Sequence, residues 1–233
     1  MTQEKPEFDS LEEYDEEAFD RPSVTVDLII FTVKDDDLKL LLKKRDSWPD
    51  EGKWALPGSF IEMDESLEDA AKRTLHEKTG LEDVYLEQLY TFGKPERDPR
   101  TRVITVGYYA LVNYEEVRDV DELENIEWHS AYSLPELAFD HEEIADYSIE
   151  RLRAKMEYST AAYSFLPEKF TLSDFQDIYE TVFDREFDRR NFRRKLKKKD
   201  IVEDTGEKTE GVSHRPAKLY RKGRELGEIV EIL

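Results

Sequence analysis

A turn followed by an acidic helix, between Pro57 and Leu81, constrains the fold of this chain more than any other stretch. Pro57-Gly58 favours a tight turn, and apolar residues at helical spacing predict a helix over residues 66–79. Taken alone, this pattern is typical of an ordinary amphipathic helix that packs on a sheet. The apolar stripe of the helix consists of Leu67, Ala70, Ala71 and Leu75.

The charged residues of this stretch resemble the Nudix box, a loop and helix that bind a metal and a diphosphate. The box reads Gly, five residues, Glu, seven residues, then Arg-Glu-aliphatic-X-Glu-Glu-X-Gly-aliphatic. Three positions depart from it: Ser59 replaces the glycine, Thr74 replaces the Glu after Arg, and Lys78 replaces the second Glu of the pair. The positions in register are Glu65, Arg73, Leu75, Glu77, Gly80 and Leu81.

The departures change the charge of the face that would hold the metal. Positions 74, 77 and 78 lie three and four residues apart, so on a helix they share one face that could hold Mg²⁺ against a diphosphate. Thr74 and Lys78 together shift the local charge by three units. Each unit interaction at about 4 Å is worth roughly 1 to 4 kcal/mol. We therefore predict no metal, no other cofactor and no catalytic residue at this site.

Two functions remain open for such a site. In the first, the pocket binds a phosphorylated or sugar ligand without hydrolysing it. In the second, the chain is a Mg²⁺-dependent hydrolase of ADP-ribose or a similar compound, and its tail serves only dimerisation. The second function requires a metal shell rebuilt from Glu62, Asp64, Glu65 and Glu77.

The length and composition of the chain favour two domains. At 233 residues with 38% hydrophobic content, the chain is long enough for two modest cores. It has no apolar run near 18 residues and no basic-then-apolar N-terminus, so we expect no membrane contact, no signal peptide and a cytoplasmic location. It contains no cysteine, which excludes disulfides, zinc–thiolate sites and cysteine nucleophiles.

The net charge of −21 argues against a nucleic-acid partner only when it is averaged over the chain. Residues 168–233 hold 16 of the 35 Lys and Arg residues and 15 of the 56 Asp and Glu residues, which leaves 19 bases against 41 acids in residues 1–167. Within the tail, the run from Arg189 to Lys199 has eight bases and no acid. Such a segment is typical of phosphate binding.

The N-terminal two thirds predict an α/β/α sandwich. An acidic arm, residues 1–22, precedes it as a mobile arm or a short docking helix. Apolar and β-branched residues predict a hairpin of two strands with a turn at residues 35–37, and further strands follow the acidic helix. Helical spacing then predicts a second helix over residues 141–158. The expected strands cover residues 24–33, 38–42, 85–92, 103–112 and 126–128.

The tail predicts a winged helix-turn-helix. Pro167 interrupts the preceding pattern, Thr171 can cap a helix running to Val182, and Asp188 can cap a second helix. Two short strands, residues 201–202 and 217–220, would form a wing around a polar loop. The whole chain is then α+β, with an arm at residues 1–22, a ligand-sensing domain at 23–160 and a DNA-binding domain at 161–233.

The tail motifs PEKFTLSDFQDIYETVF, DRRNFRRKL and RPAKLYR, in that order behind an altered Nudix box, resemble the Nudix-related transcription regulators. That family includes the NrtR repressors of NAD metabolism and the AraR regulators of arabinose use, and the resemblance covers roughly residues 24–222. It implies a homodimer, a winged helix on operator DNA and a small effector in a catalytically silent domain. The effector would be ADP-ribose, a related metabolite or a pentose such as arabinose.

The basic helix suits DNA recognition. Phe192 and Leu196, four residues apart, would hold it on its neighbour while the bases between them face the groove. Asn191 could pair with an adenine edge and the arginines with guanine. The alternative is that these bases form a solvated face of a C-terminal helix and bind no DNA. The predicted DNA-binding residues are Arg189, Arg190, Asn191, Arg193, Arg194, Lys197, Arg215 and Lys218, and His214 is a further candidate on the wing.

A second group of arginines suits an effector with phosphates. They lie on the loop between two predicted strands, beside the acidic helix. Alternatively, Arg97 and Arg100 pair with acidic residues or contact a second subunit, and His141 is a satisfied polar residue that caps the following helix. The predicted ligand-binding residues are Glu65, Arg73, Glu77, Arg97, Arg100 and Arg102.

Overall fold

Strand β1 (Ser23–Lys34) is the centre of a seven-stranded mixed sheet in the computed structural model, which describes residues 9–10, 13–82, 84–211 and 215–233. It pairs antiparallel with β2 (Asp37–Lys44) across a tight turn and parallel with β6 (Val103–Leu111). The order is β3-β2-β1-β6-β5, while β4 pairs with β1 and β7 with β2. The remaining strands are β3 (Trp54–Ala55), β4 (Gly58–Phe60), β5 (Tyr85–Phe92) and β7 (Ile126–Ser130).

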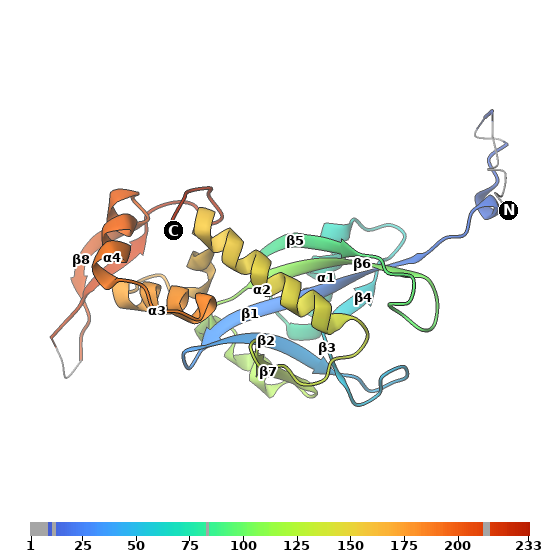
Figure 1. Ribbon diagram of the computed structural model, residues 1–233, viewed down its shortest axis with the longest axis horizontal. Helices are drawn as coiled ribbons and strands as arrows, with labels where there is room; N and C mark the ends of the chain where they lie inside the picture. The colour runs from blue at the N-terminus through green and yellow to red at the C-terminus, as the bar shows by residue number, and fades with distance from the viewer. Residues whose placement is uncertain (1–8, 11–12, 83, 212–214) are drawn as a thin grey trace.

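Two helices cover opposite faces of the sheet (Figure 1), as the sequence predicted. Side chains on β1 alternate between the faces because successive residues of a strand point in opposite directions. Val26, Leu28 and Ile30 belong to the core beneath α1 (Leu67–Thr79), and Ile29 and Phe31 belong to the core beneath α2 (His141–Tyr158). The sheet is therefore buried on both sides, and its central strand reads as an almost continuous apolar run.

The ends of α1 follow from its caps. Ser66 accepts the backbone N–H of Asp69 at the start of α1, and Gly80 ends the helix in the left-handed conformation. Helix α2 covers residues 141–158, as its apolar spacing predicted. Short 3-10 turns complete this part of the chain: η1 (Glu16–Ala18), η2 (Tyr114–Glu116) and η3 (Arg118–Glu122).

A smaller unit follows α2 at one end of the molecule (Figure 1). It begins with η4 (Thr160–Phe165) and continues through α3 (Leu172–Phe183), α4 (Arg189–Lys198), β8 (Val202–Lys208) and β9 (Lys218–Lys222). Thr171 forms a capping box with Asp174, and Asp188 accepts the backbone N–H of Asn191. The predicted helix-turn-helix and both of its caps are confirmed.

The wing differs from its prediction in length. Strand β8 reaches Lys208, although residues 203–208 are mostly polar and were expected to be loop. Polar residues are compatible with this strand because its outer positions face solvent, and the register shifts around Gly206, whose φ is +77°. His214 lies outside the described residues, as do residues 1–8 and 11–12 of the arm.

The two units share one apolar core. The cluster beneath α2 continues without a break through Tyr163, Phe175 and Tyr179 to Leu196 on α4. Hydrogen bonds reinforce this joint: the Tyr132 hydroxyl donates to the carbonyls of Thr181 and Val182 at 2.8 Å, and Arg153 Nε donates to Val182 at 2.8 Å. These carbonyls belong to the last turn of α3, where the carbonyl groups of a helix have few intrahelical donors.

The shared core makes a testable contribution to stability. The Tyr179 side chain is fully buried and its hydroxyl donates to the Met156 carbonyl at 2.9 Å. Tyr179→Phe leaves that carbonyl without a partner, and we expect it to lower the free energy of unfolding by about 1 to 3 kcal/mol in urea titrations.

The matched control is Tyr90→Phe, since Tyr90 is 55% exposed. We expect that control to change stability by less than about 0.5 kcal/mol. Equal losses in the two variants would show that the Tyr179 hydroxyl does not hold the units together.

Candidate functional site

Two of the three altered box positions contact each other. Ser59 on β4 and Thr74 on α1 lie with their hydroxyl oxygens 2.5 Å apart. The Thr74 side chain is fully buried, and its hydroxyl donates to the Ala70 carbonyl at 2.7 Å, so the Ser59 hydroxyl is the donor between them. A glycine at 59 would remove this donor. The two substitutions are therefore structurally complementary.

Arg73 engages the carboxylates that remain in the box. Its guanidinium binds Glu65 through two contacts, at 2.9 and 2.6 Å, and lies 3.3 Å from Glu77. The hydrogen bonds from Arg73 lower the pKa of Glu65 to about 2, and the backbone N–H of Glu62 contributes to this shift. Glu65 is therefore ionised at neutral pH and committed to Arg73.

These residues do not fit the divalent cation that a Nudix box implies. Thr74 offers a buried hydroxyl that is already bonded, Lys78 is a cation, and Arg73 occupies Glu65 and Glu77. Among the described residues, no group of three His, Cys, Asp or Glu side chains is placed to hold a metal ion. The rebuilt shell of Glu62, Asp64, Glu65 and Glu77 is thus not assembled here.

A cavity of about 260 Å³ opens beside Gly58. The strand β4 approaches β1 closely at this point, since a Cβ on Gly58 would lie 2.3 Å from Asp27 Oδ1 and 2.9 Å from the Val26 carbonyl oxygen. Only glycine allows this approach. The cavity walls include Arg45, Phe60, Arg97, Arg100, Phe139 and His141.

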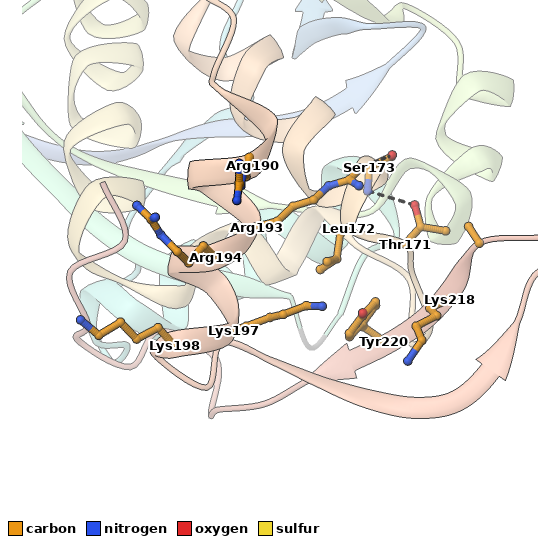
Figure 2. Close-up of a pocket in the computed structure, with 11 residues that line it drawn as sticks. Thr171, Leu172, Ser173, Arg190, Arg193, Arg194, Lys197, Lys198, Lys218 and Tyr220 are labelled. Atoms are coloured by element: carbon orange, nitrogen blue, oxygen red, sulfur yellow. Dashed lines mark hydrogen bonds between the residues drawn. The ribbon is translucent and has the colours of Figure 1, made fainter.

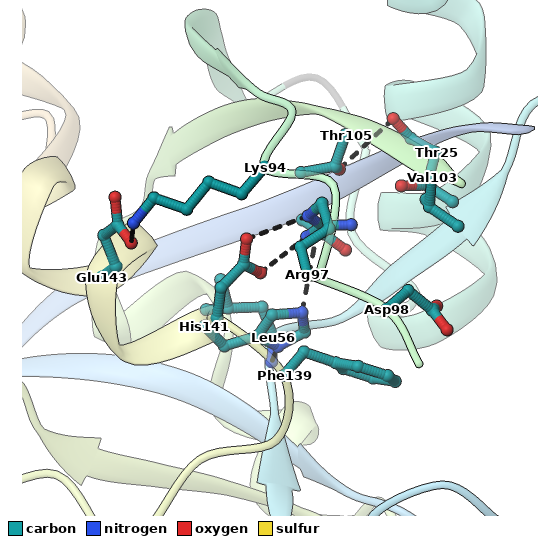
Figure 3. A network of polar contacts seen from close by, with 12 residues as sticks. Thr25, Leu56, Lys94, Arg97, Asp98, Val103, Thr105, Phe139, His141 and Glu143 are labelled. Atoms are coloured by element: carbon teal, nitrogen blue, oxygen red, sulfur yellow. Dashed lines mark hydrogen bonds and ion pairs between the residues drawn. The ribbon is translucent and has the colours of Figure 1, made fainter. Parts of the chain in front are cut away.

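Arg97 is the hub of a buried polar network behind this cavity (Figure 3). Its guanidinium donates to both carboxylate oxygens of Asp140, at 2.9 and 2.8 Å, and lies 3.3 Å from Asp27 on β1. The Arg97 side chain is only 4% exposed. Its charge is balanced by two carboxylates, and the network joins β1 to the first turn of α2.

His141 completes this network as a neutral group. Its Nδ1 accepts the backbone N–H of Leu56 at 2.9 Å, which leaves the proton on Nε2, 3.8 Å from Asp27. Burial lowers the pKa of His141 below its ordinary value. His141 is a satisfied polar residue, in agreement with the blander sequence interpretation. Asp140 is the N-cap residue, but its carboxylate binds Arg97 and caps no backbone N–H.

The predicted ligand residues separate into three groups. Arg97 and Arg100 line the cavity, and Arg100 pairs with Asp98 at 2.7 Å, which lowers the pKa of that carboxyl. Arg102 donates to the carbonyls of Gly93 and Lys94, and is absent from the cavity wall. Arg73 and Glu77 on α1 form an ion-pair cluster with Glu65, which precedes the helix, and none of the three lines this cavity.

Some cavity residues were missed from the sequence. Arg45 and Phe60 carry no motif, and nothing in their spacing announces them. Asp27 did carry a signal, because it is a carboxylate within the apolar run of β1, and a buried charge requires a partner. That partner, Arg97, is 70 residues away along the chain.

The second site is a basic groove of about 830 Å³ between the start of α3, the exposed face of α4 and strand β9 (Figure 2). Phe192 and Leu196 are buried against α3, as predicted, so the basic residues between them face outward. None of the five bases that α4 contributes lies within ion-pair distance of a carboxylate in the described part of the chain. Those five are Arg190, Arg193, Arg194, Lys197 and Lys198.

Polar contacts orient several of these groups. Arg193 donates to the Ser173 hydroxyl at 2.8 Å, and Arg194 donates to Asn191 Oδ1 at 3.0 Å. Lys218, on β9, lies in the groove wall but pairs with Asp204 at 2.6 Å. Arg189 and Arg215 are exposed and lie outside the wall.

Sequence reasoning missed part of the groove. Its wall includes Thr171 and Ser173 at the N-terminus of α3, where the backbone N–H groups of both residues are engaged in the capping box and its hydroxyl contacts. Lys198 and Tyr220 also line it. The Lys197 ammonium lies 5.4 Å above the Tyr220 ring.

Comparison with known families defines the class of this protein. Residues 22–152 match the NUDIX domain, and residues 162–222 match the NrtR DNA-binding winged helix domain. The molecule is a Nudix domain followed by a DNA-binding winged helix. No helix in the described part of the chain is both long and apolar enough to cross a membrane.

Three relatives show which proteins of this class the chain resembles. The chain is 37% identical to the ADPR responsive transcriptional repressor NtrR of Acinetobacter baylyi, over 91% of this chain and 86% of that protein. It also resembles Shewanella oneidensis NrtR complexed with a 27mer DNA, with 38% identity, a TM-score of 0.78 and coverage of 85% and 93%. The NUDIX domain of that protein complexed with ADP ribose matches at 40% identity and a TM-score of 0.53, over 61% of this chain and 96% of that one.

The third relative is an enzyme, the ADP-ribose pyrophosphatase of Methanocaldococcus jannaschii. It is 40% identical over 123 residues, which cover 53% of this chain and 70% of that protein. This similarity is confined to about half of the chain, whereas the Acinetobacter repressor and Shewanella NrtR match 91% and 85% of it. The chain belongs to the NrtR family of Nudix-related transcription regulators, as its tail motifs predicted.

The contact between Ser59 and Thr74 predicts how a metal site can be restored. The triple variant Ser59→Gly, Thr74→Glu, Lys78→Glu recreates the box and removes the side chain that faces position 74. We expect it to bind Mn²⁺ in isothermal titration calorimetry more tightly than the unmodified chain does.

The single variant Thr74→Glu is the control. It buries a carboxylate beside the Ser59 hydroxyl, and we expect it to lose about 2 kcal/mol or more of unfolding free energy. A triple variant with no gain in Mn²⁺ affinity would mean that these positions are not the former metal site.

Proposed function

We propose that this protein is a transcriptional repressor that binds operator DNA through its winged helix and responds to ADP-ribose through its Nudix domain. The observation that carries the proposal is the basic groove formed by α3, α4 and β9. It lies in the segment that matches a DNA-binding family. Its cations have few carboxylate partners and are therefore available to phosphates.

The groove suits a recognition helix in the major groove of DNA. Arg190, Arg193 and Arg194 lie on the N-terminal half and middle of α4, where recognition helices contact base edges. Arginine reads guanine through two parallel hydrogen bonds. Lys197, Lys198 and Lys218 would position the protein on the phosphates, with Arg189 and Arg215 at the edges. In a homodimer, two such helices would lie about 34 Å apart on successive turns.

The cavity beside Gly58 is proposed as the effector site. Its aromatic side chains, Phe60 and Phe139, can contact a base, while Arg45 and Arg100 favour a phosphorylated ligand. The ADP-ribose named for the Acinetobacter and Shewanella proteins supports this ligand over a pentose. The proposal divides the chain into an arm at 1–22, a sensor at 23–160 and a DNA-binding domain at 161–233, and it keeps the cytoplasmic location.

The sensor is proposed to be catalytically silent. The altered box positions and the commitment of Glu65 and Glu77 to Arg73 support this view. The alternative, an active hydrolase, has the Methanocaldococcus pyrophosphatase in its favour.

Removing two central bases from α4 tests the DNA-binding function. We expect Arg193→Ala with Arg194→Ala to abolish operator binding in gel shifts, and to leave ADP-ribose binding intact because alanine supports the helix. Any residual binding should discriminate less between operator and unrelated DNA, because contacts to base edges are lost.

The matched control removes the same charge from the sensor, as Lys72→Ala with Lys94→Ala. Both lysines are exposed, and we expect this variant to bind the operator as the unmodified protein does. Operator affinity that is the same in both double variants would refute the assignment of the groove.

A hydrolysis assay tests the silent sensor. With ADP-ribose and Mg²⁺, and the Methanocaldococcus pyrophosphatase as the positive control, we expect no turnover near about 1 s⁻¹, an ordinary enzyme rate. Turnover at that rate would establish the hydrolase alternative.

A further inference from the structure

A second cavity, of about 280 Å³, adjoins the proposed effector site. Its wall includes Lys43 at the end of β2, Arg45 just after that strand, and Lys78 in the last turns of α1. Arg45 and Gly58 also belong to the wall of the effector cavity, together with Ser47 and Leu56. The two cavities are therefore neighbours along the same short stretch of backbone.

The cations of this second cavity differ from those of the first in their partners. Arg97 and Arg100 are compensated by Asp27, Asp140 and Asp98. In the described part of the chain, neither Lys43, Arg45 nor Lys78 lies within ion-pair distance of a carboxylate.

Within the described ranges of the chain, the hydrogen-bond acceptors of Arg45 are neutral. It donates to the carbonyls of Pro49 and Ser47, at 2.7 and 3.3 Å, which leaves its charge unbalanced. The acidic residue of the cavity wall, Asp46, is exposed. Lys43 and Lys78 are both half-buried. An excess of unpaired positive charge in a concave site favours a multivalent anion.

We propose that Lys78, together with Lys43 and Arg45, binds the diphosphate of a nucleoside diphosphate sugar and thereby replaces a divalent cation. This inference rests on the sensor function proposed above. Lys78 occupies a box position at which a Nudix helix would carry a metal-binding glutamate. The lysine brings its positive charge directly to the ligand, whereas a glutamate brings that charge only through a bound metal.

The arrangement also assigns the two ends of the ligand. The nucleoside lies in the cavity with Phe60 and Phe139, and the diphosphate lies across Arg45 towards Lys78. Charge-assisted hydrogen bonds to phosphate oxygens then supply the contacts that a metal makes in a hydrolase. Effector binding consequently needs no divalent cation.

Calorimetry of the full-length protein with ADP-ribose tests this inference. We expect the dissociation constant to agree within about twofold between buffer with EDTA and buffer with Mg²⁺. Lys78→Met should weaken binding about tenfold or more in EDTA, because one charge-assisted hydrogen bond is lost. Lys78→Arg, which keeps the charge, should retain most of the affinity.

The matched control is Lys72→Met, the same substitution at an exposed position of the same helix. It should change the affinity by less than about twofold, and operator binding by both Met variants would verify that they are folded. Binding of ADP-ribose only with Mg²⁺, or wild-type affinity in Lys78→Met, would overturn the inference and leave the sensor function standing. Absence of binding in both buffers would overturn the sensor function as well.

Discussion

The apolar core that α2 shares with the winged helix is the constraint on which the rest of this molecule depends. Met156 on α2, Tyr163 on η4 and Phe175 on α3 are all buried in one cluster. Close-packed interiors transmit displacements, because no free volume absorbs them. Tyr132 and Arg153 add hydrogen bonds to the last turn of α3. The winged helix is therefore packed against the sensor and is not tethered to it by a linker alone.

Helix α2 connects the two sites because its ends lie in different environments. Its first turn carries Asp140 and His141, which bind Arg97 and Leu56 beside the cavity. Its last turn lies against the winged helix, where the Met156 carbonyl accepts from Tyr179. With 18 residues it spans about 27 Å. A ligand that changed the partners of Arg97 would act on a rigid element that ends beneath α3.

The structural features that could be predicted from the sequence are those set by residues close together along the chain. The bounds of α2, the cap at Thr171 and the inward faces of Phe192 and Leu196 depend on residues close together along the chain. The contact of Ser59 with Thr74 joins residues 15 apart, and that of Arg97 with Asp27 joins residues 70 apart. No periodicity encodes such contacts, so the sequence indicated an arginine-rich effector loop without showing which arginines are already neutralised.

The three altered box positions have two different physical consequences. Ser59, which is half-buried, and the buried Thr74 form a hydroxyl pair, which replaces a charged position with a contact that stabilises the joint between β4 and α1. Restoring Glu at position 74 alone would bury a carboxylate beside Ser59, a cost that opposes stepwise restoration of the carboxylates. Lys78 has no such partner among the described residues and instead adds a half-buried charge to a cavity wall. A site that had merely lost its catalytic function would not need an uncompensated lysine there, since an uncharged residue is easier to desolvate. The reversal of charge at position 78, combined with the hydroxyl pair at positions 59 and 74, is what a site that holds an anion without a metal requires.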